Sequence, residues 1–226
     1  ASATVAVMAQ KTPFRVERLI TDYRGVVSNG KSILCYGDYG IITHTDNFGL
    51  SWKQTSIGDK HSIKKIIATN NDYIGVTDYS LVKSQNNGYN WLQKPFSETP
   101  KIIDMAQVGS TFYVLTTNEV IVADAELHIN TIPILTLDTN TQYREIAADS
   151  SNLWILYSDK YVLHYNLQTG KTDTTDIIKH LQYNTNGGKY PIQISDIKLI
   201  EGALYVTINT DHDNSTHDNI IRSNDN

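Results

Sequence analysis

Three acidic residues in apolar segments are the first candidates for chemistry in this sequence. Asp104, Glu145 and Asp196 each lie in a short run in which apolar residues alternate with polar ones. Two carboxylates that face each other across a cleft could act as the acid and the base or nucleophile of glycoside hydrolysis. The equivalent positions of neighbouring runs carry unlike residues, so the sequence favours no particular pair. Polar side chains that bind water are the alternative interpretation.

The densest group of potential metal ligands is the segment from Asp211 to Asn219. Asp211, Asp213 and Asp218 could supply oxygen ligands to calcium, and their mixture with histidines could suit zinc. The spacing matches neither an EF-hand loop nor a zinc motif, and loops rich in Asp and Asn are ordinary turn sequences. Calcium binding and a plain polar loop therefore remain alternatives, and no other cofactor is expected.

Composition and charge exclude several classes of partner. The formal net charge is −5 with acidic and basic residues interspersed, so no binding surface for nucleic acid is expected. No apolar run approaches the roughly 20 residues of a membrane-spanning helix. The single cysteine, Cys35, lies in an apolar run, which predicts a buried structural thiol rather than a nucleophile.

A repeat of about forty residues positions these side chains. Segments rich in Val, Ile and Tyr, separated by Gly, Asn and Asp turns, predict an all-β fold. The first strand of each repeat is expected at 15–20, 63–68, 102–106, 143–148 and 194–199. The second is expected at 33–36, 73–76, 112–115, 153–157 and 204–208, and the third at 41–44, 81–84, 120–123, 162–165 and 220–223. Segments 173–191 and 211–219 are interpreted as insertions, with a short helix within 176–183.

The turn after the third strand carries the most specific motif of the chain. It reads Thr45-Asp46-Asn47-Phe48-Gly49-Leu50-Ser51-Trp52 in the first repeat and Ser84-Gln85-Asn86-Asn87-Gly88-Tyr89-Asn90-Trp91 in the second. Both resemble the Asp box, S/T-x-D-x-G-x-T/S-W, of the BNR-repeat β-propellers, a group that includes sialidases, sortilin-type receptors and photosystem II assembly factors. The residues that match are Thr45, Asn47, Gly49, Trp52, Ser84, Asn86, Gly88 and Trp91, with Asn in the acidic position of both boxes.

The resemblance implies a β-propeller of four-stranded antiparallel blades. Repeats three and four lack the box, and the fifth ends in Arg222-Ser223-Asn224-Asp225-Asn226, which matches its first four positions. We therefore expect about four complete blades and a truncated fifth within residues 10–226, in a propeller of six to eight blades. The small apolar residues 1–9 are interpreted as the remnant of a signal peptide, so the protein is expected to be secreted, periplasmic or on the cell surface.

The resemblance also implies where an active site would lie. In propellers the first strands line a central channel, so Arg15, Asp104, Arg144, Glu145 and Asp196 are candidate channel residues. The segment Thr12–Glu17 is similar to the Phe-Arg-Ile-Pro segment of sialidases but lacks its proline. A sialidase needs three arginines to clamp a carboxylate, and this chain has few: Arg15, Arg18, Arg24, Arg144 and Arg222. Exposed aromatic and basic residues are expected between the second and third strands, at Tyr39, Tyr79, Lys160 and Tyr161.

Two functions remain open at this point. The first is a non-catalytic exported propeller that binds a protein or glycan partner, as in the assembly-factor and receptor branches. The alternative is a glycoside hydrolase, sialidase-like or xyloglucanase-like, with part of its active site in blades beyond residue 226.

Overall fold

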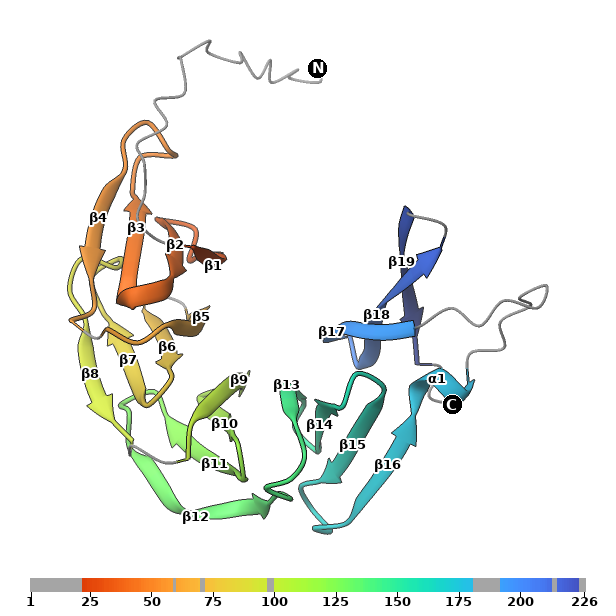
Figure 1. The fold of residues 1–226 in the computed structure, drawn as a ribbon. Helices are drawn as coiled ribbons and strands as arrows, with labels where there is room; N and C mark the ends of the chain where they lie inside the picture. The colour runs from red at the N-terminus through yellow and green to blue at the C-terminus, as the bar shows by residue number, and fades with distance from the viewer. Residues whose placement is uncertain are drawn as a thin grey trace, which may run out of the picture.

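The structure is a computed structural model that describes residues 22–58, 60–69, 72–96, 100–180, 192–212 and 215–223. Five antiparallel sheets follow one another along the chain and stand side by side around an arc (Figure 1). We call them blades 1 to 5. In the described part of the chain, blades 1 to 4 have four strands and blade 5 has three. The expected all-β fold of four-stranded antiparallel blades is confirmed.

Each blade is a meander in which consecutive strands pair. Blade 1 contains β1 (Tyr23–Ser28), β2 (Ile33–Gly37), β3 (Ile41–Thr45) and β4 (Lys53–Ser56), and a short 3-10 turn, η1 (Asp38–Gly40), joins β2 to β3. Blade 2 contains β5 (Ile63–Ala68), β6 (Tyr73–Thr77), β7 (Ser80–Ser84) and β8 (Leu92–Pro95). Blade 3 contains β9 (Ile102–Val108), β10 (Thr111–Thr116), β11 (Glu119–Asp124) and β12 (Ile129–Thr136).

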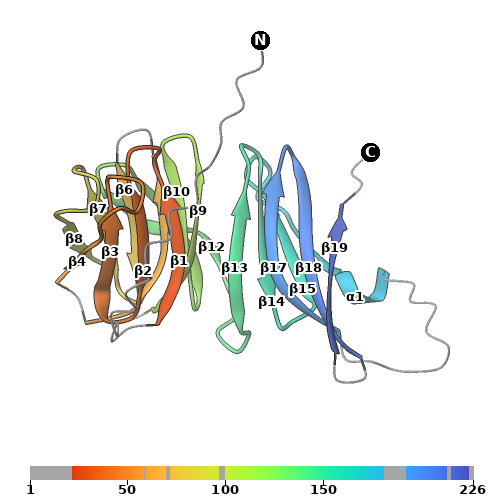
Figure 2. The same cartoon turned by 90° about the horizontal axis from the view of Figure 1, so that it is seen from above.

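The last two blades follow the same order. Blade 4 contains β13 (Tyr143–Ala148), β14 (Asn152–Tyr157), β15 (Tyr161–Asn166) and β16 (Thr172–Asp176), followed by the helix α1 (Ile177–His180). Blade 5 contains β17 (Ile192–Ile200), β18 (Ala203–His212) and β19 (Ser215–Arg222). Figures 1 and 2 show the first strands along the inner side of the arc, and Figure 1 shows the fourth strands along its outer side. No helix in the described ranges is long and apolar enough to cross a membrane.

Three sequence predictions about the elements were wrong. The first strand of blade 1 is β1, later than the predicted segment 15–20, which lies outside the described residues together with 1–9. Part of the predicted insertion 173–191 is β16, the fourth strand of blade 4. The segment 211–219, predicted to be an inserted loop, contains the end of β18 and the start of β19, with Asp211 opposite Thr216 and Asp218 opposite Asn209, so the insertion lengthens the hairpin as paired strands.

The last two errors share a physical cause. Polar Thr-rich segments form strands when a neighbouring strand satisfies their backbone groups, because β-branched Thr suits a pleated surface whatever its polarity. The short predicted helix is present as α1, at 177–180.

The apolar core lies between neighbouring blades. At the first junction, Leu34, Tyr36 and Ile42 of blade 1 pack against four residues of blade 2: Ile63, Ile66, Tyr73 and Val82. The same arrangement recurs at the next three junctions. All five residues of β6 and all five of β7 are buried, because blade 2 is covered on both faces.

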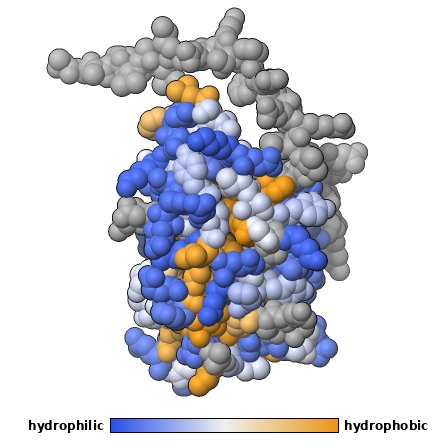
Figure 3. Space-filling view, turned by 90° about the vertical axis from the view of Figure 1, so that its left-hand side faces the viewer, coloured by the Kyte–Doolittle hydropathy of each residue, from blue (hydrophilic) through white to orange (hydrophobic). Residues whose placement is uncertain are grey.

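One face of blade 1 has no neighbour among the described residues. Val26 occupies in β1 the register position that Ile66 occupies in β5, yet Val26 is 67% exposed and Ile66 only 4%. Cys35, predicted to be buried, belongs to the adjacent strand β2 and is only partly buried, so that prediction was wrong. Figure 3, which faces the outer side of the arc, shows a mainly hydrophilic surface with apolar side chains in a central band and at the upper edge.

Candidate functional site

A bulge near the start of every first strand sets the geometry of the inner side. The pairing of first and second strands shifts by one residue at this point in all five blades. A β-bulge adds one unpaired residue and redirects the side chains beside it. The residues just after the shift share one register position, which we call the inner column: Gly25, Lys65, Asp104, Glu145 and Asp196.

Inner-column side chains bond to the main chain of the following blade. The N–H of Ile146 in β13 donates to Oδ2 of Asp104 in β9 at 3.0 Å, and the N–H of Ile197 in β17 donates to Oε2 of Glu145 at 2.9 Å. Buried N–H groups require such partners. The two carboxylates therefore link the inner strands of blades 3, 4 and 5.

Blade 1 makes the same kind of link with a different residue. Gly25 leaves room for the ring of Tyr36, because a Cβ at Gly25 would collide with the Tyr36 hydroxyl. That hydroxyl forms a hydrogen bond with the backbone of Ile66 in the first strand of blade 2. The Tyr36 hydroxyl, for which Gly25 leaves space, thus links two blades as a carboxylate does elsewhere. This explains why equivalent positions of the first strands carry unlike residues.

Two lysines pair with carboxylates of the inner column. The ammonium of Lys65 lies 2.9 Å from Oδ1 of Asp104, and that of Lys198 lies 3.0 Å from Oδ1 of Asp196. Burial, and next the hydrogen bond to the Asp196 carboxyl, raises the pKa of Glu145 to about 7. Burial alone would raise the pKa of Asp196 too, but hydrogen bonds from Glu145 and Lys198 hold it below its usual value.

The structure thus brings together three of the five candidate channel residues. Asp104, Glu145 and Asp196 belong to one column, whereas Arg15 lies outside the described residues. Arg144 is next to the column in sequence, but its side chain reaches the turn between β14 and β15. There Nη1 donates to Oδ1 of Asp159 at 2.6 Å and to the Ile194 carbonyl at 2.9 Å.

A second repeated feature lies at the turns between the second and third strands. The residue at the bulge of β1, β5 and β13 is basic, and it pairs with an Asp of its own blade's turn: Arg24–Asp38 at 2.6 Å, Lys64–Asp78 at 2.8 Å and Arg144–Asp159 at 2.6 Å. The pairs are 14 or 15 residues apart, a signal that was present in the sequence and was not recognised there.

Each of these turn aspartates also contacts the next blade. Ser62 donates its hydroxyl to Asp38 at 2.7 Å, and Lys101 lies 2.9 Å from Asp78. Hydrogen bonds from Ser62 and then Arg24 lower the pKa of Asp38, so its carboxylate stays ionised. The turns are therefore held in fixed positions relative to the inner strands.

Aromatic and basic side chains surround these turns. Tyr39 is 63% exposed, the Tyr79 ring meets His61 edge to face, and the ammonium of Lys160 lies 4.6 Å from the centre of the Tyr161 ring. In the pair between Lys101 and Asp78, the lysine is 49% exposed and the aspartate 11%, so solvent meets the positive partner. We call this end of the blades the turn face, defined by Arg24, Tyr39, Tyr79, Lys101, Lys160 and Tyr161.

The turns after the third strands lie at the opposite end of the blades. In blade 1 the N–H of Gly49 donates to the Thr45 hydroxyl at 3.0 Å, and the N–H of Ser51 donates to Oδ1 of Asn47 at 3.0 Å. In blade 2 the matching bonds measure 2.9 Å to Ser84 and 2.8 Å to Asn86, donated by Gly88 and Asn90. The residues that match the Asp box thus close these turns through hydrogen bonds.

The two tryptophans of these turns differ in environment. Trp91 packs against the core between blades 1 and 2 and donates its indole N–H to the Gly88 carbonyl at 3.0 Å. Trp52, at the same place in blade 1, is 46% exposed, since no described blade lies before it. The packing of the tryptophan therefore depends on the preceding blade.

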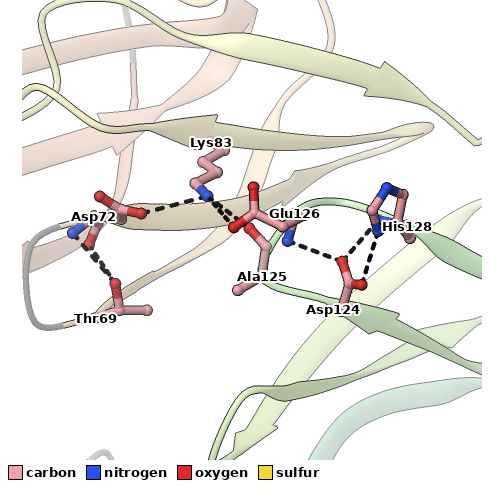
Figure 4. A network of polar contacts seen from close by, with 7 residues as sticks. All are labelled: Thr69, Asp72, Lys83, Asp124, Ala125, Glu126 and His128. Carbon is pink, nitrogen blue, oxygen red and sulfur yellow. Dashed lines mark hydrogen bonds and ion pairs between the residues drawn. The ribbon is translucent and has the colours of Figure 1, made fainter.

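Blade 3 has a related turn built on another residue. Oδ1 of Asp124 accepts hydrogen bonds from the N–H groups of Glu126 and His128, at 2.8 and 2.9 Å (Figure 4). The carboxylate takes the place of the hydroxyl of Thr45 or Ser84, which sequence comparison with the box did not reveal. The equivalent turn of blade 4 is closed on Asn166, whose Oδ1 accepts from Thr169 at 2.9 Å.

Lys83 joins the ends of blades 2 and 3 in the same region. Its ammonium, on a side chain that is 3% exposed, donates to the Ala125 carbonyl at 2.8 Å and lies 3.2 Å from Glu126 and 3.4 Å from Asp72 (Figure 4). A buried ammonium with this set of partners is a structural link rather than a free nucleophile.

A groove of about 800 Å³ lies nearby, between the first hairpins of blades 1 to 3. Its polar lining includes Asn29 and Thr69, whose side chains already close their own turns. Two of the polar side chains in its lining are thus engaged by the fold.

Metal binding by Asp211, Asp213 and Asp218 stays a prediction. Asp211 and Asp218 lie in paired strands, and Asp213 lies outside the described residues. Within the described ranges, no three His, Cys, Asp or Glu residues are grouped as a metal site would require.

Comparisons with known proteins define the class. The sequence matches no protein-family model and no curated protein. Similar structures include the Pan2 WD40 domain of Neurospora crassa (TM-score 0.62, 10% identity, 87% of this chain and 59% of that chain) and YCF48 from Cyanidioschyzon merolae (TM-score 0.60, 11% identity, 91% and 70%). YCF48 bound to D1 peptide is also similar (TM-score 0.61, 11% identity, 88% and 67%).

At this level of identity the likeness concerns the fold alone. The chain has a β-propeller fold, and it spans 59% of the length of the Pan2 domain that it matches.

Proposed function

We propose that this chain is part of a non-catalytic, exported β-propeller that binds a protein or glycan partner through the turn face. The observation that carries the proposal is a group of tyrosines, one exposed and two half-buried, beside basic side chains that pair with aspartates at Asp38, Asp78 and Asp159. Tyrosine and arginine are favoured at binding surfaces. Tyrosine buries much area with little loss of conformational freedom.

The exposed charges favour an acidic group on the partner. Asp38 and Asp78 are mostly buried, while Arg24 and Lys101 present their charges to solvent; Asp159 is the exception, because it is more exposed than its partner Arg144. An acidic peptide segment or an acidic sugar would meet complementary charge there, although the whole chain is net negative. One of the similar structures is a complex with a peptide, which supports protein over glycan as the partner. The Asp-box resemblance supports the assembly-factor and receptor branches of the BNR group.

The alternative, a glycoside hydrolase, has one observation in its favour. A carboxyl with a pKa of about 7, as at Glu145, would suit a general acid. However, Glu145 and Asp196 hydrogen-bond each other, whereas the two carboxyls of a glycosidase stand roughly 5 to 9.5 Å apart with the scissile bond between them. Glu145 also accepts the Ile197 N–H, which supports a structural role.

The proposal that the protein is exported rests on the sequence of residues 1–9 alone. A fusion of residues 1–9 to a reporter, compared with the reporter alone, tests whether the segment can act as the end of a signal sequence when a charged start is supplied.

The binding proposal is tested with defined probes and the purified chain. An array of acidic and neutral peptides and of acidic and neutral glycans is expected to yield acidic ligands. Fluorogenic sialoside and glucan substrates are expected to remain intact over the same period. Turnover that disappears in Glu145→Gln would favour the hydrolase instead, and ligands without acidic groups would contradict the charge argument.

A further inference from the structure

The junction between blades 4 and 5 differs from the one before it in how its linking carboxyl is neutralised. Between blades 3 and 4, Asp104 accepts the Ile146 N–H while the Lys65 ammonium, 2.9 Å away, balances its charge. Between blades 4 and 5, Glu145 accepts the Ile197 N–H, but its side-chain partner is a second carboxyl, Asp196. The ammonium of Lys198 pairs with Asp196, at 3.0 Å, and acts on Glu145 through its charge.

The surroundings of Glu145 disfavour its charged form. The charged groups that act on it are Asp196 of β17 and Asp104 of β9, and Lys198 of β17 acts on all three carboxyls. From β14, the residue opposite Glu145 is Leu156, which does not titrate. A neutral Glu145 can donate a hydrogen bond to Asp196 and accept one from the Ile197 N–H at the same time, whereas an ionised Glu145 would face another carboxylate at a partly buried site.

We propose that Glu145 is a pH-sensitive link between blades 4 and 5, which holds β17 against β13 while Glu145 is protonated and loosens blade 5 when it ionises. Loosening is expected to be confined to blade 5, because the carboxyl of the link at Asp104 is paired with the ammonium of Lys65 rather than with a second carboxyl.

The direction in which pH changes stability follows from the difference between the pKa of Glu145 in the folded and the unfolded chain. The pKa of Glu145 in the folded chain, about 7, lies above the ordinary value of 4.5, so folding favours the protonated form. The stability that this contributes is complete below pH 4.5 and is lost as the pH rises to 7. The lowered pKa of Asp196 acts only in the acid range below its ordinary value of 3.8, and so does not obscure the change.

Segment-resolved hydrogen exchange at pH 5.5 and 7.5, corrected for the intrinsic rates, tests the proposal on the whole chain. We expect opening of β17 and β18 to increase on the order of tenfold at the higher pH, while β5 and β6 do not open more. The variant Glu145→Gln, which stays neutral, should show no such increase in β17 and β18. Asp196→Asn removes the second charge and should reduce the increase.

A second measurement separates the charge state from stability. The carboxyl carbon resonance of Glu145, assigned by its loss in Glu145→Gln, should titrate near pH 7 in the folded chain and shift toward 4.5 in Asp196→Asn. The proposal is overturned if Glu145→Gln retains the wild-type increase in exchange, if β5 and β6 open equally, or if Glu145 titrates at its ordinary value.

Discussion

The backbone N–H of Ile146 donates a hydrogen bond to Oδ2 of Asp104, 3.0 Å away, and so joins the inner strands of blades 3 and 4. The donor is beside a bulge and the acceptor comes from another blade. Asp104 is held in turn by Lys65. A residue that looks catalytic by its type and strand position therefore has its oxygens engaged by the fold itself.

Removal of this carboxylate should destabilise the chain strongly. Asp104→Ala leaves a buried N–H and the Lys65 ammonium without their partner, at an expected cost of about 2 to 4 kcal/mol. Asp104→Asn keeps an acceptor for Ile146 and should cost less. Urea unfolding of the three proteins measures the difference, and an Asp104→Ala chain as stable as the wild type would contradict the role assigned to the link.

Equivalent positions on the exposed face of blade 1 and the buried face of blade 2 allow a matched pair of substitutions. Ile66→Ala removes buried methyl groups between blades 1 and 2, and should cost about 2 to 5 kcal/mol. Val26→Ala, at the same register position one blade earlier, should change stability by no more than about 0.5 kcal/mol, because Val26 is exposed. Thermal or urea unfolding checks both, and a large loss in Val26→Ala would show that this face is covered.

Two turn glycines should respond differently to alanine. Gly49 and Gly88 both have positive φ, 84° and 89°, so alanine is strained at either position. A Cβ at Gly88 would also lie 2.6 Å from Cδ2 of Leu34 in blade 1, whereas at Gly49 the nearest atom is 3.7 Å away. We expect Gly88→Ala to destabilise by at least about 1 kcal/mol more than Gly49→Ala. Equal losses in equilibrium unfolding would contradict the close packing of the two blades.

His44 should make the chain less stable in mild acid. Its ring is buried beside Tyr89, with neither nitrogen hydrogen-bonded, and burial lowers its pKa below the ordinary 6.5. The unfolded chain therefore binds the proton more readily, and the stability that neutral His44 contributes is lost as the pH falls below about 6.5. The unfolding free energy of His44→Phe, compared with wild type at pH 5 and 7.5, should show this loss as a smaller pH effect in the variant.

Much of the fold was predictable because its signals are local and repeated. Alternating Ile, Val and Tyr residues predicted most second and third strands, and Gly and Asn marked the turns between them. The first strand of blade 1 was misplaced because 15–20 and 23–28 both have strand-like composition, and pairing with β2 decides between them. The strand β16 was missed because its sequence, Thr-Asp-Thr-Thr-Asp, has no apolar pattern.

The candidate site was less predictable because its contacts join different blades. The sequence placed Asp104, Glu145 and Asp196 on first strands, but not the bulge that sets their common register. Tyr36 could not be foreseen as the counterpart of a carboxylate, since its position depends on the space over Gly25. The Asp124 turn was missed because the acidic residue stands first in the turn rather than third.

The most direct test of the binding account is a comparison of substitutions at the two ends of the blades. The triple variant Tyr39→Ala, Lys101→Ala and Tyr161→Ala alters the turn face, and Phe48→Ala, Leu50→Ala and Leu92→Ala alters other exposed residues as a control. With an acidic ligand from the array, calorimetry should show affinity at least about tenfold weaker for the first variant and unchanged for the control. Unchanged binding by the turn-face variant, with both proteins folded, would contradict the account.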